Sequence, residues 1–372
     1  MAGLRQLPLA ALHRELGARM VPFAGWEMPV QYPAGVMAEH LHTRSAAGLF
    51  DVSHMGQVIL RGGGAAAALE RLVPVDVAGL GEGRQRYAMF TTDAGGILDD
   101  LMVARRADHL VLVVNAARAD VDLAHLRAGL PAGVTVEPVA DRALIALQGP
   151  GAEAALEALA PGAAAMRFMD VATLVWEGAQ LWVSRSGYTG EDGYEISVPV
   201  TAAEAFARAL LARPGVAPVG LGARDSLRLE AGLCLWGQDI DEETSPVEAG
   251  LGWAIQKVRR AGGARAGGFP GADRILHELA AGPSRARVGL MPEGRAPMRA
   301  GVPLLSEDGA APVGRITSGG FAPSLGQPVA MGLLPIHLCA PGTRVYGELR
   351  GRRLAARVTA LPFRAPRYRR GG

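Results

Sequence analysis

Residues 185–195, R-S-G-Y-T-G-E-D-G-Y-E, are the part of this chain whose side chains are best suited to chemistry. The glycines reach positive φ without strain, so they allow the backbone to turn tightly. The carboxylates and phenols between them are not needed for a turn. They suit a ligand rich in N–H donors, such as a pterin or a purine edge. An ordinary hairpin loop with Glu191 and Asp192 in water explains the same residues, and residue types alone leave both interpretations open.

Two adjacent acids, Asp99 and Asp100, interrupt the apolar run of residues 97–103. Neighbouring side chains in a strand point to opposite faces. We therefore expect one acid to face solvent or a turn, and the other to face the interior or a cavity. An inward carboxylate is costly unless it is hydrogen-bonded, and it often marks a working site. The spacing favours a functional acid but does not say which of the two it is.

Arginines form two further groups. Arg224 and Arg228 share one face of a helix predicted from residue 222, where a fixed guanidinium can bind a carboxylate or carbonyl through two hydrogen bonds. A surface pair with a neighbouring acid explains these two arginines as well. The second group surrounds Tyr368 near the C-terminus, where we expect a solvated, disordered end; it consists of Arg364, Arg367, Arg369 and Arg370.

The elements that must position these residues follow from hydrophobic periodicity. Strands and helices alternate through the first two thirds of the chain, and the order of hairpin then helix occurs twice. This repetition predicts two related α+β units. After Trp253, residues 259–271 are rich in Arg, Gly and Ala and predict a flexible connection. Short β-like segments separated by Gly and Pro follow, so we expect a C-terminal β-barrel or sandwich.

Bulk composition excludes several classes of protein. The 372 residues are 49% hydrophobic and 20% charged, which is typical of a globular protein of two or three domains. A net charge of +2 gives no electrostatic indication of nucleic acid or membrane partners. The two cysteines, Cys234 and Cys339, lack the spacing of a metal site, and no other metal motif occurs. With no signal-peptide pattern at the start, they indicate a reducing compartment, so a cytoplasmic location is expected.

Several ordered motifs together resemble one family, the T-protein of the glycine cleavage system. Among them are F-A-G-W-E-M-P at residues 23–29, G-L-F-D-V-S-H-M-G at 48–56 and G-G-I-L-D-D-L at 95–101. The others are V-V-N-A at 113–116, L-Q-G-P at 147–150, the segment 185–195, G-A-R-D at 222–225 and residues 314–323. Each motif is weak alone, but the set follows the family order and covers nearly the whole chain.

The resemblance implies an aminomethyltransferase that uses tetrahydrofolate and receives its substrate from the lipoylated H-protein. It implies a three-domain cloverleaf with the folate in a central cavity. The implied domains are residues 1–54 with 151–254, residues 55–150 carrying the catalytic acid, and residues 255–372 as the barrel. Because the segment 259–271 departs from the Lys-rich form usual in the family, H-protein would have to dock there through arginines.

Carried over residue by residue, the resemblance assigns the catalytic acid to Asp100. Glu195 would accept hydrogen bonds from the pterin edge, and Arg224 would hold its acceptor side. Arg369 or Arg370 would contact the folate tail. The other positions that the resemblance places around the cavity are Met55, Tyr87, Asn115, Tyr188 and Trp253.

Two alternatives use the same scaffold. One is another folate-dependent enzyme, such as a demethylase, although the sequence has no flavin-binding half. The other is a non-enzymatic folate-binding factor for iron–sulfur assembly. Such factors carry a Lys-Gly-Cys-Tyr-x-Gly-Gln motif, whereas this chain has L-C-L-W-G-Q at residues 233–238 and keeps Asp100. Both differences favour the enzyme.

Overall fold

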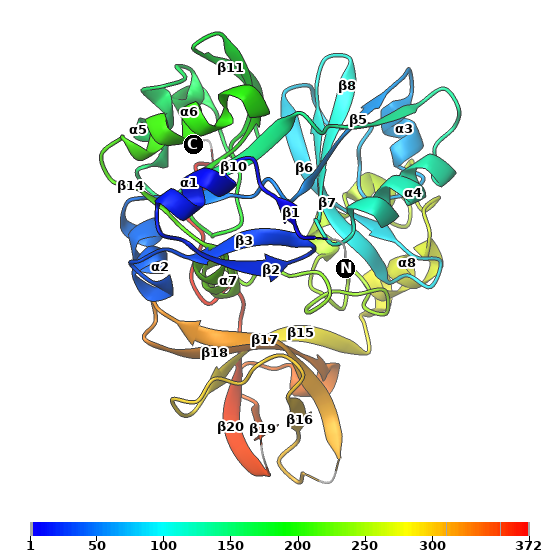
Figure 1. The fold of residues 1–372 in the computed structure, drawn as a ribbon. Helices are drawn as coiled ribbons and strands as arrows, with labels where there is room; N and C mark the ends of the chain where they lie inside the picture. The colour runs from blue at the N-terminus through cyan, green and yellow to red at the C-terminus, as the bar shows by residue number, and fades with distance from the viewer. Residues whose placement is uncertain (1–2, 310, 350, 371–372) are drawn as a thin grey trace.

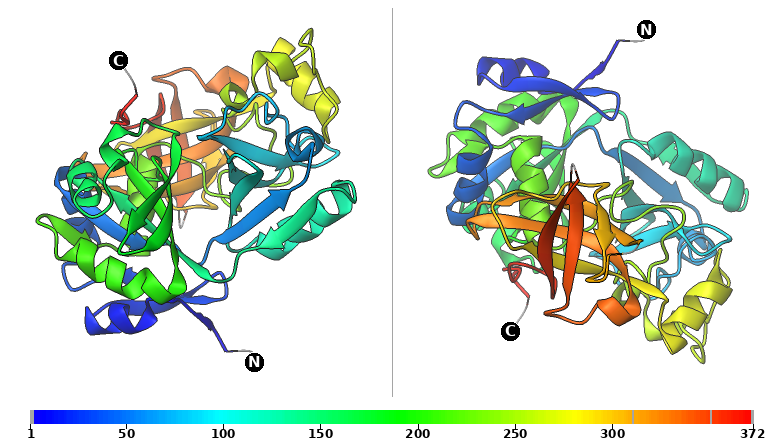
Figure 2. Two further views of the ribbon diagram at one scale, coloured as in Figure 1. Left: turned by 90° about the horizontal axis from the view of Figure 1, so that it is seen from above. Right: turned by 90° about the horizontal axis from the view of Figure 1, so that it is seen from below.

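The computed structural model describes residues 3–309, 311–349 and 351–370. Two sheet-containing units stand above a closed barrel (Figure 1). Seen from below, the barrel lies across both units (Figure 2). The predicted α+β architecture with a C-terminal β-barrel is confirmed. Within the described ranges, no helix has both the length and the apolar character needed to cross a membrane.

The first unit is built on a six-stranded sheet in the order β11-β12-β13-β10-β4-β14. Alternate residues of its strand β10 pack against different helices. Ile145 and Leu147 belong to a core shared with α5 and α6, whereas Leu144 and Ala146 pack toward α7. A strand covered on both faces needs a continuous apolar run, which is why residues 143–147 were predictable as a strand. The elements of this unit are β4 (Ala47–Asp51), β10 (Arg142–Gln148), β11 (Val171–Trp176), β12 (Ala179–Ser184), β13 (Gly193–Pro199), β14 (Val216–Pro218), α1 (Ala10–Glu15), α2 (Val36–Ser45), α5 (Ala152–Glu157), α6 (Val200–Leu211) and α7 (Leu221–Glu230).

The second unit contains a five-stranded sheet in the order β6-β7-β8-β5-β9. On one face of β7, Ile97, Leu101 and Val103 flank Asp99 and join a core that also contains Leu69 and Leu126 from the covering helices. The sheet therefore fixes which face of β7 is buried beneath α4. Its elements are β5 (Gly56–Arg61), β6 (Arg84–Thr91), β7 (Ile97–Arg105), β8 (His109–Val114), β9 (Thr135–Pro138), α3 (Ala65–Leu69) and α4 (Ala119–Gly129).

A small N-terminal sheet was not predicted from the sequence. It pairs β1 (Arg5–Gln6), β3 (Trp26–Gln31) and β2 (Arg19–Phe23) in that order. The hairpin between β2 and β3 turns through Ala24 and Gly25, whose φ values of 49° and 80° are those of a tight two-residue turn. Proline in both strands of the hairpin, which is uncommon in sheet interiors, obscured the pattern.

The C-terminal barrel closes in the order β15-β18-β17-β16-β19-β20. Alternating residues such as Leu290, Ile316 and Val345 fill its interior. Its strands are β15 (Arg285–Pro292), β16 (Pro303–Leu305), β17 (Pro312–Ala322), β18 (Gln327–Pro335), β19 (Arg344–Leu349) and β20 (Arg352–Thr359). Between the second unit and the barrel lie α8 (Ala272–Ala281) and the short turns η2 (Gly252–Ala254) and η3 (Lys257–Arg259); η1 (Ala163–Ala165) and η4 (Ile336–Leu338) lie elsewhere.

The chain enters the six-stranded sheet twice, which is what a discontinuous domain requires. β4, from the N-terminal part, pairs with both β10 and β14. The predicted boundary at residue 150 assigns β10 to the second unit. In the structure β10 instead pairs with β13 and β4, so the chain has already entered the six-stranded sheet at Arg142.

The segment 259–271 is not the flexible connection that its composition predicted. Arg259 is only 4% exposed, and its Nη2 donates to the carbonyl of Glu70 at 2.8 Å. Arg265 pairs with Glu70 at 2.5 Å and with Asp76 at 2.6 Å. These arginines attach the segment to the second unit, and composition could not reveal their buried partners.

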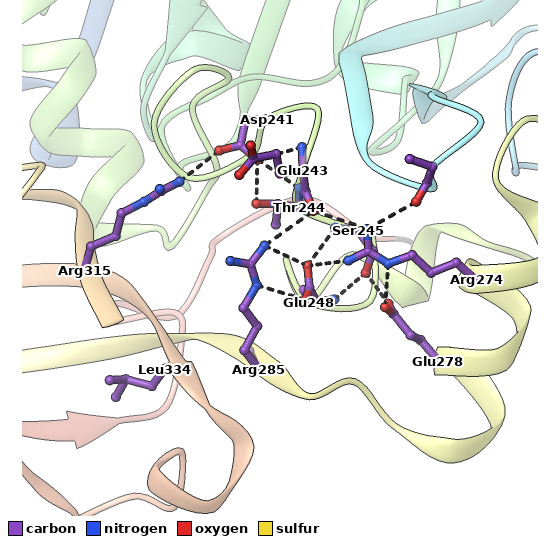
Figure 3. A network of polar contacts seen from close by, with 12 residues as sticks. Asp241, Glu243, Thr244, Ser245, Glu248, Arg274, Glu278, Arg285, Arg315 and Leu334 are labelled. Atoms are coloured by element: carbon purple, nitrogen blue, oxygen red, sulfur yellow. Dashed lines mark hydrogen bonds and ion pairs between the residues drawn. The ribbon is translucent and has the colours of Figure 1, made fainter. Parts of the chain in front are cut away.

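A polar network joins the barrel to the rest of the chain (Figure 3). Its centre is Glu248, whose carboxylate is almost fully buried and pairs with Arg274 of α8 at 3.0 Å and with Arg285 of β15 at 2.9 Å. Arg315 of β17 reaches Asp241 at 2.9 Å. One buried carboxylate thus connects α8, the barrel and the loop that leads to Trp253.

Replacing Glu248 with Gln should destabilise the protein, because a neutral amide cannot satisfy two guanidinium groups. The expected loss in the free energy of unfolding is about 1–3 kcal/mol, measured by urea denaturation. Arg344→Ala is the matched control, since it breaks an exposed barrel pair with Glu293 and should cost about 1 kcal/mol or less. Equal losses in the two variants would contradict a special role for Glu248.

Candidate active site

Asp100 lies on the face of β7 opposite to the helix-covered core, and two neighbours hold its carboxylate. The hydroxyl of Tyr87, from β6, donates to Oδ2 at 3.1 Å, and the Nδ2 amide of Asn115, just after β8, donates to Oδ1 at 2.7 Å. Burial, followed by the negative charge of Asp99, raises the pKa of Asp100 to about 7. A carboxyl group poised near neutral pH can exchange a proton during a reaction.

The expectation that one acid of the pair faces solvent or a turn is wrong. Asp99 is 0% exposed and lies beneath α4, where it accepts hydrogen bonds from the backbone N–H of Asn115 at 3.3 Å and from its Nδ2 at 2.9 Å. The two acids do point to opposite faces, as strand geometry requires. Both faces of β7 are covered here, so neither acid reaches bulk water freely.

Aromatic rings adjoin Asp100. The ring of Tyr87 stacks against Trp253 with centroids 5.8 Å apart, and Trp253 is itself 65% exposed. Tyr188 lies near enough for the charge of Asp100 to raise its pKa, an effect that adds to that of burial. Asp100, Tyr87 and Tyr188 are enclosed by protein atoms on most sides, yet each keeps some accessible surface. These three residues are therefore partly accessible, and the exposed ring of Trp253 stacks on one of them.

The segment 185–195 does not behave as a water-facing hairpin. Glu191 is 1% exposed and pairs with Arg44 at 3.0 Å, while Asp192 pairs with the fully buried Arg185. A Cβ at Gly187 would lie 1.8 Å from the side-chain oxygen of Gln148, so glycine is needed for this close approach. The interpretation of these two acids as solvated is therefore wrong, because their role is to fix the loop.

Glu195 and Arg224 approach each other on the same side of the molecule as Tyr188. The guanidinium of Arg224 lies over the ring of Tyr188, 4.8 Å from its centroid, and the charge of Glu195 acts on it. Glu195 accepts a hydrogen bond from the hydroxyl of Ser186 at 2.9 Å. Burial lowers the pKa of Arg224. Through Tyr188, the loop 185–195 and α7 are connected to the acid on β7.

Two buried polar atoms in this region have no hydrogen-bond partner within the residues that the structure describes: Nη1 of Arg224 and Nδ1 of His54. The two residues are neighbours, since the charge of Arg224 adds to burial in lowering the pKa of His54 to about 4. A buried donor without a partner is costly unless a ligand satisfies it. A group with an acceptor toward Arg224 and N–H donors toward Glu195 would satisfy both sides of this site.

The resemblance also placed Met55, Arg369 and Arg370 around the folate, and the structure shows the contacts of each. Met55 follows His54 in sequence and packs against the core of the first unit, as does Val113 of β8. Arg370 places its guanidinium over the rings of Phe168 and Tyr368, at 5.6 and 5.9 Å from their centroids. Arg369 donates to Glu153, which leaves Arg370 as the better candidate for a ligand tail.

The C-terminal arginines do not form the disordered end that was expected. The backbone N–H of Arg367 donates to the carbonyl of Gly190 at 2.8 Å, and that of Arg364 donates to the carbonyl of Glu230 at 3.0 Å. Tyr368 stacks on Phe168 with centroids 4.2 Å apart. The tail is therefore packed on the loop 185–195, because that loop offers carbonyl groups which the sequence alone did not reveal.

Comparison with known proteins gives one consistent result. Residues 9–259 match the GCVT N-terminal domain, and residues 285–364 match the glycine cleavage T-protein C-terminal barrel domain. The chain belongs to the glycine cleavage T-protein family. The chicken and human mitochondrial aminomethyltransferases are 46% and 45% identical to it over 98% of this chain, covering 94% and 91% of their own lengths.

A solved structure agrees with these relatives. The glycine cleavage system aminomethyltransferase T from Bartonella henselae is 46% identical, has a TM-score of 0.92, and is covered over 99% of this chain and 100% of its own. The activity shared within the family is aminomethyl transfer, so the chain is an enzyme of the glycine cleavage system. This confirms the family and the activity that the sequence motifs predicted.

Sequence reasoning missed two residues of the site. His54 was not named as a site residue, although it directly precedes Met55. Asp122 is 0% exposed under β7. The signal for Asp122 was present, because Ala119, Asp122 and Leu126 fall on one face of α4 at helical spacing.

The raised pKa of Asp100 predicts a stability cost. Its pKa is about 7 in the folded protein and about 3.9 in the unfolded chain. Between these values the folded state binds more protons, so stability falls as pH rises. Asp100→Asn should therefore raise the free energy of unfolding at pH 8 by about 1–3 kcal/mol, and the gain should shrink at pH 5. Urea unfolding at both pH values measures it, and a pH-independent difference would contradict the assignment.

Proposed function

We propose that this enzyme transfers the one-carbon unit of aminomethyl-dihydrolipoyl H-protein to tetrahydrofolate, with Asp100 as the catalytic acid–base group. The products are 5,10-methylenetetrahydrofolate, ammonia and dihydrolipoyl H-protein. The observation that carries the proposal is the hydrogen-bonded Asp100, whose pKa is about 7, with Tyr188 between it and Arg224, whose Nη1 has no partner in the described residues and on which the charge of Glu195 acts. The reaction is inferred from the family to which the chain belongs, and the role of each residue is inferred from the contacts of its side chain.

The reaction balances without an oxidant. Two C–N bonds to the folate nitrogens form, while the C–S bond to the lipoyl arm and the C–N bond to the amino group break. Two protons leave the folate nitrogens, and one goes to ammonia and one to the thiol. A nearby group that can hold a proton briefly is therefore useful, and Asp100 has a suitable pKa for this.

The remaining residues bind and orient. Glu195 presents carboxylate oxygen to the N–H groups of a pterin, and Arg224 presents Nη1 to its carbonyl oxygen. Tyr87 and Asn115 hold Asp100 in one rotamer, so the acid meets the reacting nitrogens in a fixed position. Trp253, stacked on Tyr87, offers an aromatic face to the bound folate, and Tyr188 and Met55 are proposed to line the same site.

Three further proposals rest on general features. Lipoylated H-protein is the proposed partner; Arg259 and Arg265 are already paired within the protein, so no docking surface is assigned to the segment 259–271. Arg370, with Arg369 as the second candidate, is proposed to attract the anionic folate tail. A cytoplasmic location stays a prediction that rests on the free cysteines.

Asp100→Asn should fold but lose most turnover, by about 10²-fold or more, because the amide neither accepts nor releases a proton. In the wild-type enzyme, kcat should rise as the pH passes about 7, where Asp100 ionises. Ammonia release is measured with tetrahydrofolate and aminomethylated H-protein, and each is omitted in turn. Wild-type turnover in the variant, or release that does not need tetrahydrofolate, would rule out the proposal.

Glu195→Gln should weaken tetrahydrofolate binding about 10-fold, because a carboxylate oxygen becomes an NH₂ group that faces the donors of the pterin. Isothermal calorimetry gives the affinity directly. Glu204→Gln is a suitable control, since Glu204 lies on the exposed face of α6 and pairs only with Arg208 there. An affinity equal to that of the control would remove Glu195 from the binding site.

A further inference from the structure

Behind Asp100, two other carboxyl groups meet in the protein interior. Asp99 on β7 and Asp122 on α4 are both 0% exposed, and they lie close enough for a hydrogen bond between them to shift the pKa of each. Both carboxylate oxygens of Asp122 lack a donor from any other part of the described chain. Two carboxylates in contact repel each other, so the contact is favourable only when one of them carries a proton.

The hydrogen bonds show which acid carries that proton. Asp99 accepts two N–H groups of Asn115, at 3.3 and 2.9 Å, and such donors stabilise an ionised carboxylate. Asp122 receives no such donor. Burial, together with the hydrogen bond and charge of Asp99, raises the pKa of Asp122 to about 9. At neutral pH the stable arrangement is a neutral Asp122 that donates to an ionised Asp99.

Asn115 connects this pair to the active site. Its Nδ2 donates to Asp99 at 2.9 Å and to the Oδ1 of Asp100 at 2.7 Å, and it lies 3.1 Å from the backbone carbonyl of Asp100. The two hydrogens of this nitrogen are thus directed to both carboxylates, and the carbonyl of Asp100 is a longer third contact. A rotated amide would turn its carbonyl oxygen toward two negative charges. The orientation of Asn115 therefore depends on Asp99 being an ionised acceptor.

We propose that Asp122 is a positioning residue of the transfer reaction: as a neutral carboxylic acid it donates to Asp99, keeps Asp99 ionised, and through Asn115 holds Asp100 in its working position. The effect on turnover rests on the proposed function of Asp100. The sharing of a proton by Asp99 and Asp122 does not.

Other charges around the pair act on it from identifiable elements. Arg118, at the start of α4, favours ionisation of Asp122, although its guanidinium is held over the ring of Trp236 and pairs with Glu242. Asp100, on the far face of β7, opposes ionisation of Asp122. Tyr87, Tyr188 and Cys234 lie near Asp100. They are neutral near pH 7, because burial raises the pKa of each.

The protonated pair can be measured without any substrate. In the folded full-length enzyme at pH 8, infrared spectroscopy should show the carbonyl band of a buried carboxylic acid. Asp122→Asn should remove that band while leaving the fold intact, because its amide can donate to Asp99 as the acid does. Identical carboxylic-acid bands in the two proteins would overturn the proposal. This result does not depend on whether the proposed function is correct.

Kinetics then test the positioning role. Asp122→Ala removes the donor, so we expect kcat to fall about 10-fold or more while KM for tetrahydrofolate stays within about threefold. Asp99 should then take up the proton itself, and the loss of its charge should move the acid limb of the kcat profile to lower pH. Asp122→Asn should restore most of kcat and leave the limb near that of the wild type.

If Asp122 only packed in the protein interior and did not position Asp100, the variants would give different results. Loss of stability without a shift of the acid limb in Asp122→Ala, or an equal loss of kcat in the Asn and Ala variants, would overturn the positioning role. Wild-type kcat in Asp122→Ala would overturn it as well. If Asp122→Ala does not fold, the infrared comparison of the wild type with Asp122→Asn decides the question.

Discussion

A carboxylate that is enclosed by protein yet able to change its protonation state is the constraint on which the rest of the structure depends. Ionising Asp100 is costly there, as its raised pKa shows. The cost is limited by Tyr87 and Asn115, and their positions require that β6, β7 and β8 be adjacent strands of one sheet. The sheet therefore serves mainly to bring one acid, one phenol and one amide to the same place.

Close backbone packing keeps that place rigid. The loop after α7 lies directly on the start of β7: a Cβ on Gly96 would lie 1.7 Å from the carbonyl oxygen of Glu242, and the carbonyl of Asp241 accepts the N–H of Ile97 at 2.9 Å. The same loop is held to the barrel through Arg315 and Arg285. A barrel that contributes no predicted catalytic acid thus stabilises the strand that carries Asp100, which explains why the three parts form one enzyme.

The sequence predicted much of the fold, because a helix or strand that is buried on one or two faces has a regular spacing of apolar residues. The repeated order of hairpin then helix predicted the α+β units, and the short β-like segments after residue 271 predicted the C-terminal barrel. The hairpin β2–β3 was missed because prolines disturb its alternation. One acid of the pair Asp99 and Asp100 was expected to face solvent or a turn, one of two interpretations put Glu191 in water, and the C-terminal arginines were expected in a disordered end. In each of these cases a polar side chain or backbone group is satisfied by a partner far away in sequence, such as Arg44 for Glu191, and composition carries no information about such partners.

The sequence predicted the site residues only as separate motifs. How they act together becomes clear only when one considers which unit each of them comes from. Glu195 and Arg224 come from the first unit and Asp100 from the second, while the loop that carries Trp253 joins the second unit to the barrel. The proposed pterin-binding pair and the proposed catalytic acid therefore lie on different units. A reaction that joins a carrier-bound carbon to a folate needs two substrates to meet in one orientation, and placing their binding groups on different units makes that meeting depend on the assembled fold. The buried pair Asp99 and Asp122 behind Asp100 has a similar purpose. A charge near the reacting atoms must be fixed before the substrates bind.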